Sequence, residues 1–101
     1  MDAQPTILEH AAAIVDGDRE QTYGDPGRNL RAIASLWTAW LVARGHLPAD
    51  SVLTTDDVAP MMTLLKLARL ANDPRHKDSQ IDACGYLRLL ERVQTPPSTP
   101  S

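Results

Sequence analysis

The sequence predicts an all-α protein, folded as a compact bundle of about four helices. Apolar residues recur every three or four positions along four separate stretches of the chain. The chain has no Phe and is rich in Ala and Leu, which suits packed helices better than sheets. A length of 101 residues is enough for one domain with one core. We therefore expect a single helical domain over residues 1–93, followed by a flexible Pro/Ser tail over residues 94–101.

The first helix is expected over residues 6–16. Thr6 and Glu9 have the spacing of a capping box, and Gly17 can end the last turn. One face of this helix is apolar and includes Ile7, His10, Ala11, Ile14 and Val15.

The second helix is expected from Pro26 to Arg44. Asp25 can cap its start, proline is favoured at the first helical position, and Gly45 follows the end. Its apolar face is the heaviest in the chain and consists of Leu30, Ile33, Leu36, Trp37, Trp40 and Leu41. Residues 46–53 are expected to form a loop.

The third helix is expected to start at Thr54 or Thr55 and to end near Asn72. Pro60 removes one backbone hydrogen bond and predicts a kink or a later start. The core stripe is Val58, Met61, Met62, Leu65 and Ala68.

The fourth helix follows a turn at residues 72–78 and is expected to reach Val93. Ser79 and Asp82 have capping-box spacing at its start. Its apolar stripe is Ile81, Cys84, Leu87 and Leu90.

The composition excludes several classes of protein. A net charge of −3 and the absence of a basic cluster argue against a duplex-DNA binder. Cys84 is the only cysteine, so an internal disulfide is excluded and a buried, inert thiol is expected. The start of the sequence lacks the pattern of a signal peptide, and no apolar run is long enough to span a bilayer. We expect a cytoplasmic protein.

Four acidic residues, Asp16, Asp18, Glu20 and Asp25, cluster between the first two helices. Their alternate spacing is typical of the opening of a calcium-binding loop. Gln21 and Gly27, however, occupy the positions that an EF-hand gives to glycine and glutamate. A solvated acidic loop with Asp25 as a helix cap is the favoured interpretation.

Two pairs of charges face each other across the predicted third and fourth helices. Lys66 and Arg69 are spaced i, i+3, and Asp78 and Asp82 are spaced i, i+4. The short turn makes these helices antiparallel neighbours, so we expect Lys66 or Arg69 to contact Asp78 or Asp82. Gly85, one turn later, indicates a close backbone approach.

This cluster has two interpretations. It is either an interhelical salt-bridge network, with Asp82 also capping a helix, or a site where basic residues meet phosphate and aspartates hold a divalent cation.

The sequence resembles a domain family of unknown function found in bacteriophages and prophages. The resemblance covers about residues 8–90 and rests on the strings REQTYGDPGRNLRAIASLW, DDVAPMMTLLKLAR and KDSQIDACGY. Its motif residues are Tyr23, Gly24, Asp25, Asn29, Trp37, Lys66, Arg69, Asp78, Asp82, Gly85 and Tyr86. The family has no established activity. A phage origin implies the host cytoplasm as the location.

A looser likeness is to the MazG-type nucleoside triphosphate pyrophosphohydrolases, which bind magnesium with paired acids on two helices. Asp82 is similar to the last of those acids, but Ser79, Lys66 and Arg69 stand where further acids are expected. The likeness implies Lys66, Asp78 and Asp82 as catalytic residues. Asp78 and Asp82 would hold Mg²⁺.

The loop before the second helix has a role in that reading. The helix start favours an anion, and glycine lets the backbone approach a ligand. The binding residues of such a nucleotide pocket are Arg19, Tyr23, Gly24, Asp25, Asn29, Arg69 and Tyr86. Alternatively, the loop folds over the core and the Tyr23 hydroxyl bonds to Asp82 or Asp78.

Two functions are therefore carried forward. The first is a nucleotide-binding protein that resembles the MazG type, and its extended form is a Mg²⁺-dependent pyrophosphohydrolase. The second is a non-catalytic helical module that acts on a host or phage protein or as an oligomer. Trp37 and Trp40, one turn apart on an already sufficient apolar face, predict a homodimer.

Overall fold

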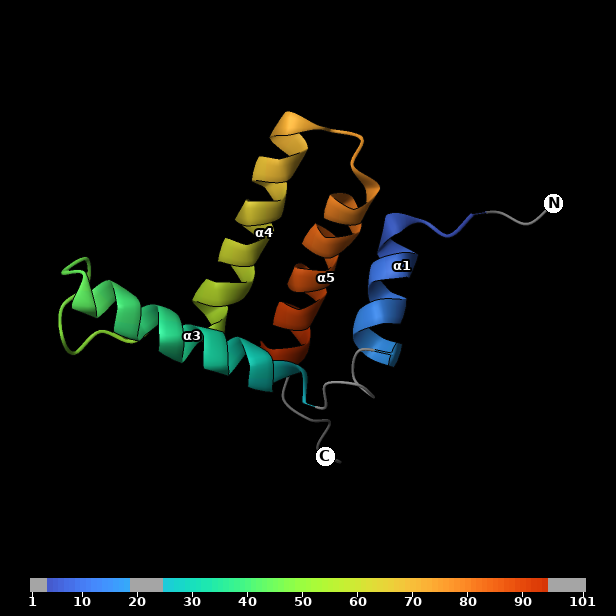
Figure 1. Ribbon diagram of the computed structural model, residues 1–101. Coiled ribbons are helices and arrows are strands. Elements are labelled where there is room, and N and C mark those ends of the chain that lie inside the picture. Colours follow the sequence, from blue (N-terminus) through green and yellow to red (C-terminus); the bar gives the residue numbers. More distant parts are fainter. Residues whose placement is uncertain (1–3, 19–24, 95–101) are drawn as a thin grey trace, which may run out of the picture.

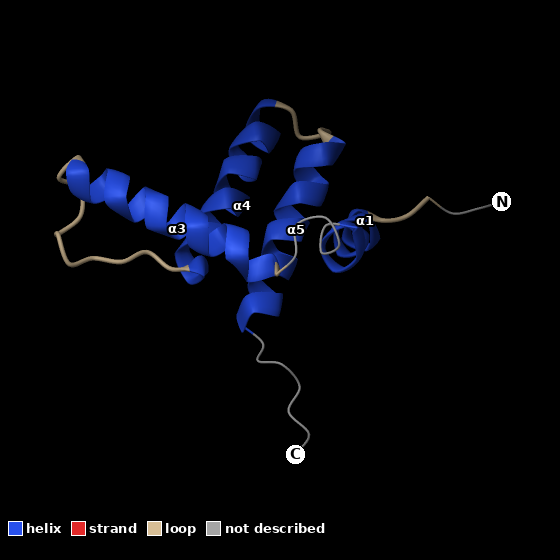
Figure 2. Cartoon of the chain, turned by 60° about the horizontal axis from the view of Figure 1, so that its bottom comes forward, coloured by secondary structure: helices blue, strands red, loops and turns tan. Residues whose placement is uncertain are grey.

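The computed structural model describes residues 4–18 and 25–94, and within these ranges every regular element is a helix. The elements are α1 (Ile7–Ala13), the π-helix η1 (Ile14–Asp18), α3 (Pro26–Ala43), α4 (Thr55–Asn72) and α5 (Lys77–Gln94) (Figures 1 and 2). The predicted all-α fold with four α-helices is confirmed. The predictions for residues 19–24 and for the tail at 95–101 lie outside the described residues.

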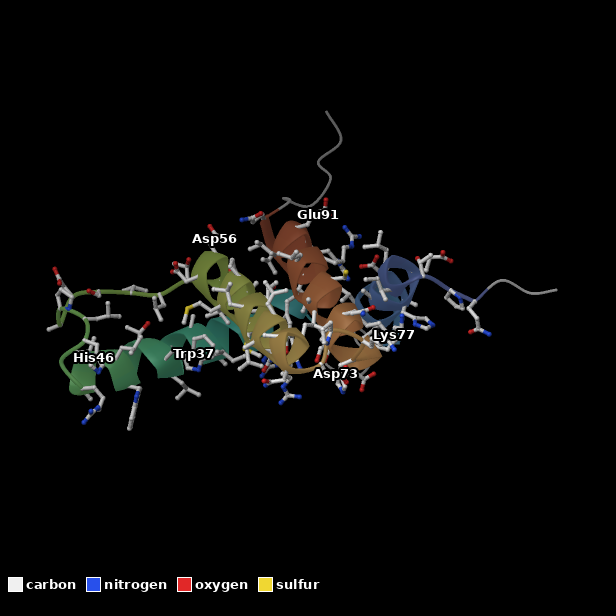
Figure 3. All side chains as sticks on the ribbon, turned by 90° about the horizontal axis from the view of Figure 1, so that it is seen from above. Trp37, His46, Asp56, Asp73, Lys77 and Glu91 are labelled. Atoms are coloured by element: carbon white, nitrogen blue, oxygen red, sulfur yellow. The ribbon has the colours of Figure 1, made fainter. Side chains whose placement is uncertain are left out.

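The α4 and α5 helices form an antiparallel hairpin, and the other two helices are added to it. The α1 helix packs against α5 on the side away from α4, while α3 crosses the open end of the hairpin and contacts both α4 and α5 (Figure 1). Seen from above, Asp73 and Lys77 mark the turn of the hairpin, whereas Trp37 lies on the part of α3 that continues past it and His46 lies in the loop after that part (Figure 3). We call this part of α3, residues 35–43, the α3 arm.

Local signals in the sequence account for most helix starts. The capping boxes of Thr6 with Glu9 and of Thr54 with Asp57 are both present. Asp25 caps α3 by accepting a hydrogen bond from the Gly27 N–H at 3.0 Å. After α3, Gly45 takes a positive φ of 79°, a conformation that suits glycine.

The first helix was expected to continue to residue 16, but its regular α part ends at Ala13 and the wider π-helical turns of η1 follow. The Val15 carbonyl in η1 accepts a hydrogen bond from Arg92 Nη1 of α5 at 3.2 Å. Contact with α5 therefore influences the conformation of residues 14–18. The apolar periodicity of the sequence alone does not predict this contact.

The expected late start at Pro60 is wrong, and the alternative of a kink stays a prediction. The α4 helix begins at Thr55, and Pro60 lies inside it. The capping box at Thr54 fixes the start, and a proline this early in the helix removes a single intrahelical hydrogen bond.

The expected cap of the fourth helix is also wrong. The α5 helix starts at Lys77, so Ser79 already lies in its first turn, where it is buried. The Ser79 N–H donates to His76 Nδ1 at 3.2 Å, and the Ser79 hydroxyl oxygen lies 2.8 Å from the same nitrogen. His76 thus fills the capping role that the spacing assigned to Ser79 and Asp82.

The core lies where α3 crosses the hairpin and where η1 reaches it. Its buried residues are Val15, Leu30, Ala34, Val58, Ala59 and Leu89. Several residues expected in the core stripes are instead exposed: Leu36, Trp40, Met61, Leu65 and Leu87. The periodicity predicted the apolar faces, but α3 and α4 cross instead of lying side by side, so only part of each face is covered.

The crossing is close at the start of α3. A Cβ atom on Gly27 would stand 3.2 Å from Val93 Cγ1 at the end of α5 and 2.6 Å from Nη1 of the flexible Arg31 side chain. Glycine at this position lets the first turn of α3 approach α5.

Within residues 4–18 and 25–94, no helix combines the length and the apolar character needed to cross a membrane.

Candidate functional site

The facing charges on the hairpin meet in one ion pair. Lys66 Nζ lies 2.9 Å from Asp82 Oδ2, which confirms the expected contact between α4 and α5. The Lys66 side chain is only 14% exposed, whereas that of Asp82 is 44% exposed. Removing the carboxylate would leave a nearly buried ammonium group without its partner.

The other two charges of the predicted cluster do not join this pair. The side chains of Arg69 and Asp78 are exposed, and no hydrogen bond or ion pair links either of them to another described residue. The expected four-charge network is therefore reduced to Lys66 and Asp82. Spacing placed Asp78 and Asp82 on one side of α5, but only Asp82 is level with the lysine.

Asp82 also forms part of the wall of a hollow between α1–η1 and α5. The hollow has a volume of about 140 Å³ and is lined by Ala11, Ile14, Val15, Ile81, Asp82, Gly85, Tyr86 and Leu89. We call it the Asp82 hollow. Among these lining residues Asp82 is the only carboxylate, and most of the others are apolar. The arrangement presents one carboxylate on the wall of a space that is lined by both polar and apolar atoms.

Gly85 contributes open space to this hollow. A Cβ atom added to Gly85 would meet Val15 Cγ2 at 3.7 Å, an ordinary van der Waals distance, and no backbone atom lies within 4 Å of it outside the local helix. The expected close backbone approach at Gly85 is therefore wrong. The absence of a side chain there leaves room beside Asp82.

A second charged cluster holds the η1 wall of the hollow in place. Arg88 donates from Nε and Nη2 to the Asp16 carboxylate at 3.1 Å each, and Arg88 Nη1 lies 2.6 Å from Glu91 Oε1. The Asp16 and Glu91 carboxylates raise the pKa of Arg88, in that order of effect. Asp16, one of the four clustered acids, thus acts as a tie between η1 and α5.

The sequence did not single out this tie. Arg88 and Arg92 are spaced i, i+4 on α5, which places two guanidinium groups on one side of the helix. Their acidic partner is more than seventy residues away along the chain, and local spacing carries no information about such a pair.

Asp25 and Asn29, two predicted binding residues at the start of α3, do not line the Asp82 hollow. Asp25 is bound to Arg31 Nη2 at 2.8 Å and to the Gly27 N–H, and these two hydrogen bonds lower the pKa of its carboxyl group. Asn29 is exposed in the first turns of α3. Arg19, Tyr23 and Gly24 lie outside the described residues, as does the predicted bond from the Tyr23 hydroxyl. Tyr86 lines the Asp82 hollow.

The carboxylates can be tested against the needs of a magnesium site. In the described part of the chain no group of three His, Cys, Asp or Glu side chains is placed to hold a metal ion. Asp78 and Asp82 offer two carboxylates, and Lys66 engages one oxygen of the second. These residues alone do not fit Mg²⁺, which needs several oxygen ligands at short distance. The magnesium site stays a prediction that requires further ligands.

The chain was compared with known families and proteins. The family model of a domain of unknown function, DUF6378, matches residues 6–94. Two "Gene 55 protein" relatives come from mycobacteriophages. The protein of phage L5 is 42% identical over 91 residues, which cover 90% of this chain and 54% of that protein. The protein of phage D29 is 34% identical over 92 residues, which cover 91% of this chain and 56% of that protein.

The chain thus spans about half the length of the curated relatives it matches. No solved structure matches it. The expected phage family of unknown function is confirmed over nearly the whole described fold, whereas the likeness to MazG-type enzymes stays a prediction. The chain belongs to the DUF6378 family, a family of domains of unknown function with relatives in mycobacteriophages.

Proposed function

We propose that this domain binds a nucleotide and receives the base in the Asp82 hollow. The observation that supports this function best is a half-exposed carboxylate, held by a nearly buried lysine, on the wall of a hollow that several apolar side chains help to line. Binding sites typically combine apolar walls with a few fixed polar groups.

The volume of the hollow fits a single flat ring system. At about 140 Å³ it is similar to the engineered apolar cavity of ~150 Å³ that accepts benzene. Sites for whole drug-sized ligands are larger, about 300–1,000 Å³. The base therefore enters the hollow between apolar side chains and Tyr86, and the sugar and phosphates stay outside it.

Asp82 would provide the specific contact. Its Oδ2 atom is engaged by Lys66, and no described residue donates a hydrogen bond to Oδ1. An ionised carboxylate accepts N–H groups, and aspartate is a known acceptor for the exocyclic amino group of a base. In this proposal Lys66 orients Asp82, and the lysine ammonium group is engaged by that carboxylate and is not available to neutralise phosphate.

This arrangement supports binding better than it supports catalysis. The pyrophosphohydrolase reading assigns Lys66, Asp78 and Asp82 to catalysis, but Lys66 is paired and Asp78 is remote from any described partner. The two aspartates alone do not complete a magnesium site. A separate assay of pyrophosphate release from adenosine and cytidine triphosphates with Mg²⁺ tests for hydrolysis.

Isothermal titration calorimetry tests the proposal with adenosine and cytidine triphosphates, their nucleosides, and inorganic pyrophosphate, each with and without Mg²⁺. We expect the nucleosides and the triphosphates to bind and pyrophosphate alone not to bind. Asp82→Asn should weaken binding about tenfold, the loss expected for one charged hydrogen bond.

The matched control is Asp78→Asn, which removes the same charge from the same helix one turn earlier. Binding by this variant should equal that of the wild type. Absence of saturable binding, or an equal loss in both variants, would contradict the base-binding proposal. Hydrolysis that is lost in Asp78→Asn would instead support the pyrophosphohydrolase.

The second candidate is the non-catalytic helical interaction module. It is favoured by a different observation, the exposed apolar side chains of α3 and α4. It predicts that substitutions at Lys66 and Asp82 change only stability.

A further inference from the structure

We propose that two copies of this domain associate through an apolar face formed by the α3 arm and α4. We call this surface the outer face and define it by Leu36 and Trp40 of α3 and Met61, Leu64 and Leu65 of α4. The proposal is independent of nucleotide binding, because no residue of the outer face lines the Asp82 hollow.

The outer face is a continuous surface made by two helices. The exposed fractions are 70% for Leu36, 65% for Trp40 and 62% for Leu64, with Met61 and Leu65 also more than two-fifths exposed. Met61 of α4 lies together with Trp37, Trp40 and Leu41 of α3 around a shallow hollow with apolar walls. The two helices therefore contribute to one patch. Clustered apolar side chains of this size on a protein surface indicate an interaction site.

The absence of charge on the outer face indicates what kind of partner binds there. Residues 32–43 contain no ionisable side chain, and neither do residues 58–65. A charged partner surface would lose hydration here without gaining an ion pair. Interfaces between identical subunits are the most apolar class, and a two-fold axis places the same patch on both sides. A second copy therefore presents an equally apolar and uncharged surface to the outer face.

The area is sufficient for a specific dimer. The exposed portions of the five side chains amount to about 600 Å² per protomer, or roughly 1,200 Å² when two copies meet, which is the lower end of the range for specific interfaces. Trp40 is the natural anchor, because a partly exposed tryptophan contributes the largest single area and is enriched at binding hot spots.

The shape of the fold leaves this surface open. The α3 arm continues beyond the hairpin, so that the arm and α4 form two sides of a corner (Figures 1 and 3). The loop after α3 runs back to α4 and is fixed to the arm by a hydrogen bond from the Leu53 N–H to Thr38 Oγ1 at 2.9 Å. The arm is therefore held in position, and a second copy meets a preformed surface.

Sedimentation velocity and equilibrium across about 1–100 µM test the proposal, a range that covers a dissociation constant in the micromolar region. The wild type should be dimeric at the upper end. The matched variants are Leu65→Lys in the outer face and Leu87→Lys on α5, at residues that are 45% and 50% exposed, respectively. Leu87 belongs to a helix that contributes nothing to the outer face.

Leu65→Lys should be monomeric throughout this range, and Leu87→Lys should dimerise like the wild type. Circular dichroism checks that both variants are folded. Tryptophan fluorescence gives a second readout, because dilution of the wild-type dimer should re-expose Trp40 and shift its emission to longer wavelength. Leu65→Lys should show no such shift.

A monomeric wild type at 100 µM would overturn the proposal. Equal behaviour of the two lysine variants would also overturn it, because association would then use another surface. Asp82→Asn should dimerise normally, so failure of the nucleotide proposal and failure of the dimer proposal are separate results.

Discussion

The second half of α3 is the more apolar of the two, yet the fold buries residues of the first half more completely. In the first half, Leu30 and Ala34 are almost inaccessible to water, and Gly27 lies against Val93. In the second half, Leu36 and Trp40 expose about two-thirds of their surface. The difference arises because α4 and α5 cross only the first half (Figure 1). An apolar helix face thus predicts burial only where another element covers it.

The largest expected effect on stability is the difference between one leucine substitution in each half of α3. Leu30→Ala removes a side chain from the packed crossing and should lower the free energy of unfolding by about 2–5 kcal/mol. Leu36→Ala truncates the same residue type on the arm and should change it by less than about 0.5 kcal/mol. Urea unfolding at about 1 µM protein measures both, because this low concentration limits dimer formation. Equal losses would show that the arm is covered in the folded protomer.

The ion pair joins a nearly buried side chain, Lys66 on α4, to a half-exposed one, Asp82 on α5. Substituting each partner therefore compares a covered position with an open one. Asp82→Ala leaves the nearly buried Lys66 without its partner and should lower the free energy of unfolding by about 1–2 kcal/mol, a value reduced by the exposure of Asp82. Lys66→Met leaves a half-exposed carboxylate and should lower the free energy of unfolding by less. The double variant should recover most of the loss, since neither charge remains unpaired. A double-mutant cycle in urea gives the coupling, and strictly additive losses would contradict the pair.

Gly27 lies at a packed site and Gly85 at an open one, so substituting each with alanine compares the two environments. Gly85→Ala places a methyl group at ordinary contact distance from Val15 and should raise the free energy of unfolding by about 0.5–1 kcal/mol. Gly27→Ala must displace Val93 at the packed crossing and should gain less or become unfavourable. Thermal unfolding ranks the two variants. The Gly85→Ala methyl group also enters the Asp82 hollow, so calorimetry should show weaker base binding despite the higher stability.

The smallest effect on stability is expected at Asp25, the exposed residue that caps α3. The hydrogen bonds from Arg31 and the Gly27 N–H lower the pKa of Asp25 below the ordinary value of 3.8 for an aspartate. A carboxyl whose pKa is lowered by folding stabilises the fold above its unfolded pKa, and this contribution is lost as the pH falls through the folded value. Wild type should exceed Asp25→Asn in stability at pH 7 and match it well below pH 3.8. A difference that persists in strong acid would assign the effect to capping geometry alone.

The fold was predictable where local chemistry decides it. Thr6, Asp25 and Thr54 identify the starts of three helices, because a capping side chain acts within three residues of its target. The same rule failed at Ser79, where His76 caps instead. Periodicity identified Leu30 and Val58 correctly but could not show that Leu36 and Met61 lie beyond the helix crossing.

The candidate site was predictable in part for the same reason. A short turn forces α4 and α5 together, so the pairing of Lys66 with Asp82 followed from spacing along two neighbouring helices. The hollow beside Asp82 also needs Val15 and Ala11, which arrive from the other end of the chain. No local pattern specifies which face of α5 receives α1, and the Asp16–Arg88 tie that fixes it was therefore not foreseen.

The tie between Asp16 and Arg88 also sets an order of events during folding. The α4–α5 hairpin closes over a four-residue turn, whereas α1 reaches α5 across 72 positions of sequence. Closing the longer loop costs more chain entropy. The α1 helix should accordingly dock last and detach first. Amide hydrogen exchange should then be faster in α1 than in α4, and each such opening would expose the inner wall of the hollow to solvent.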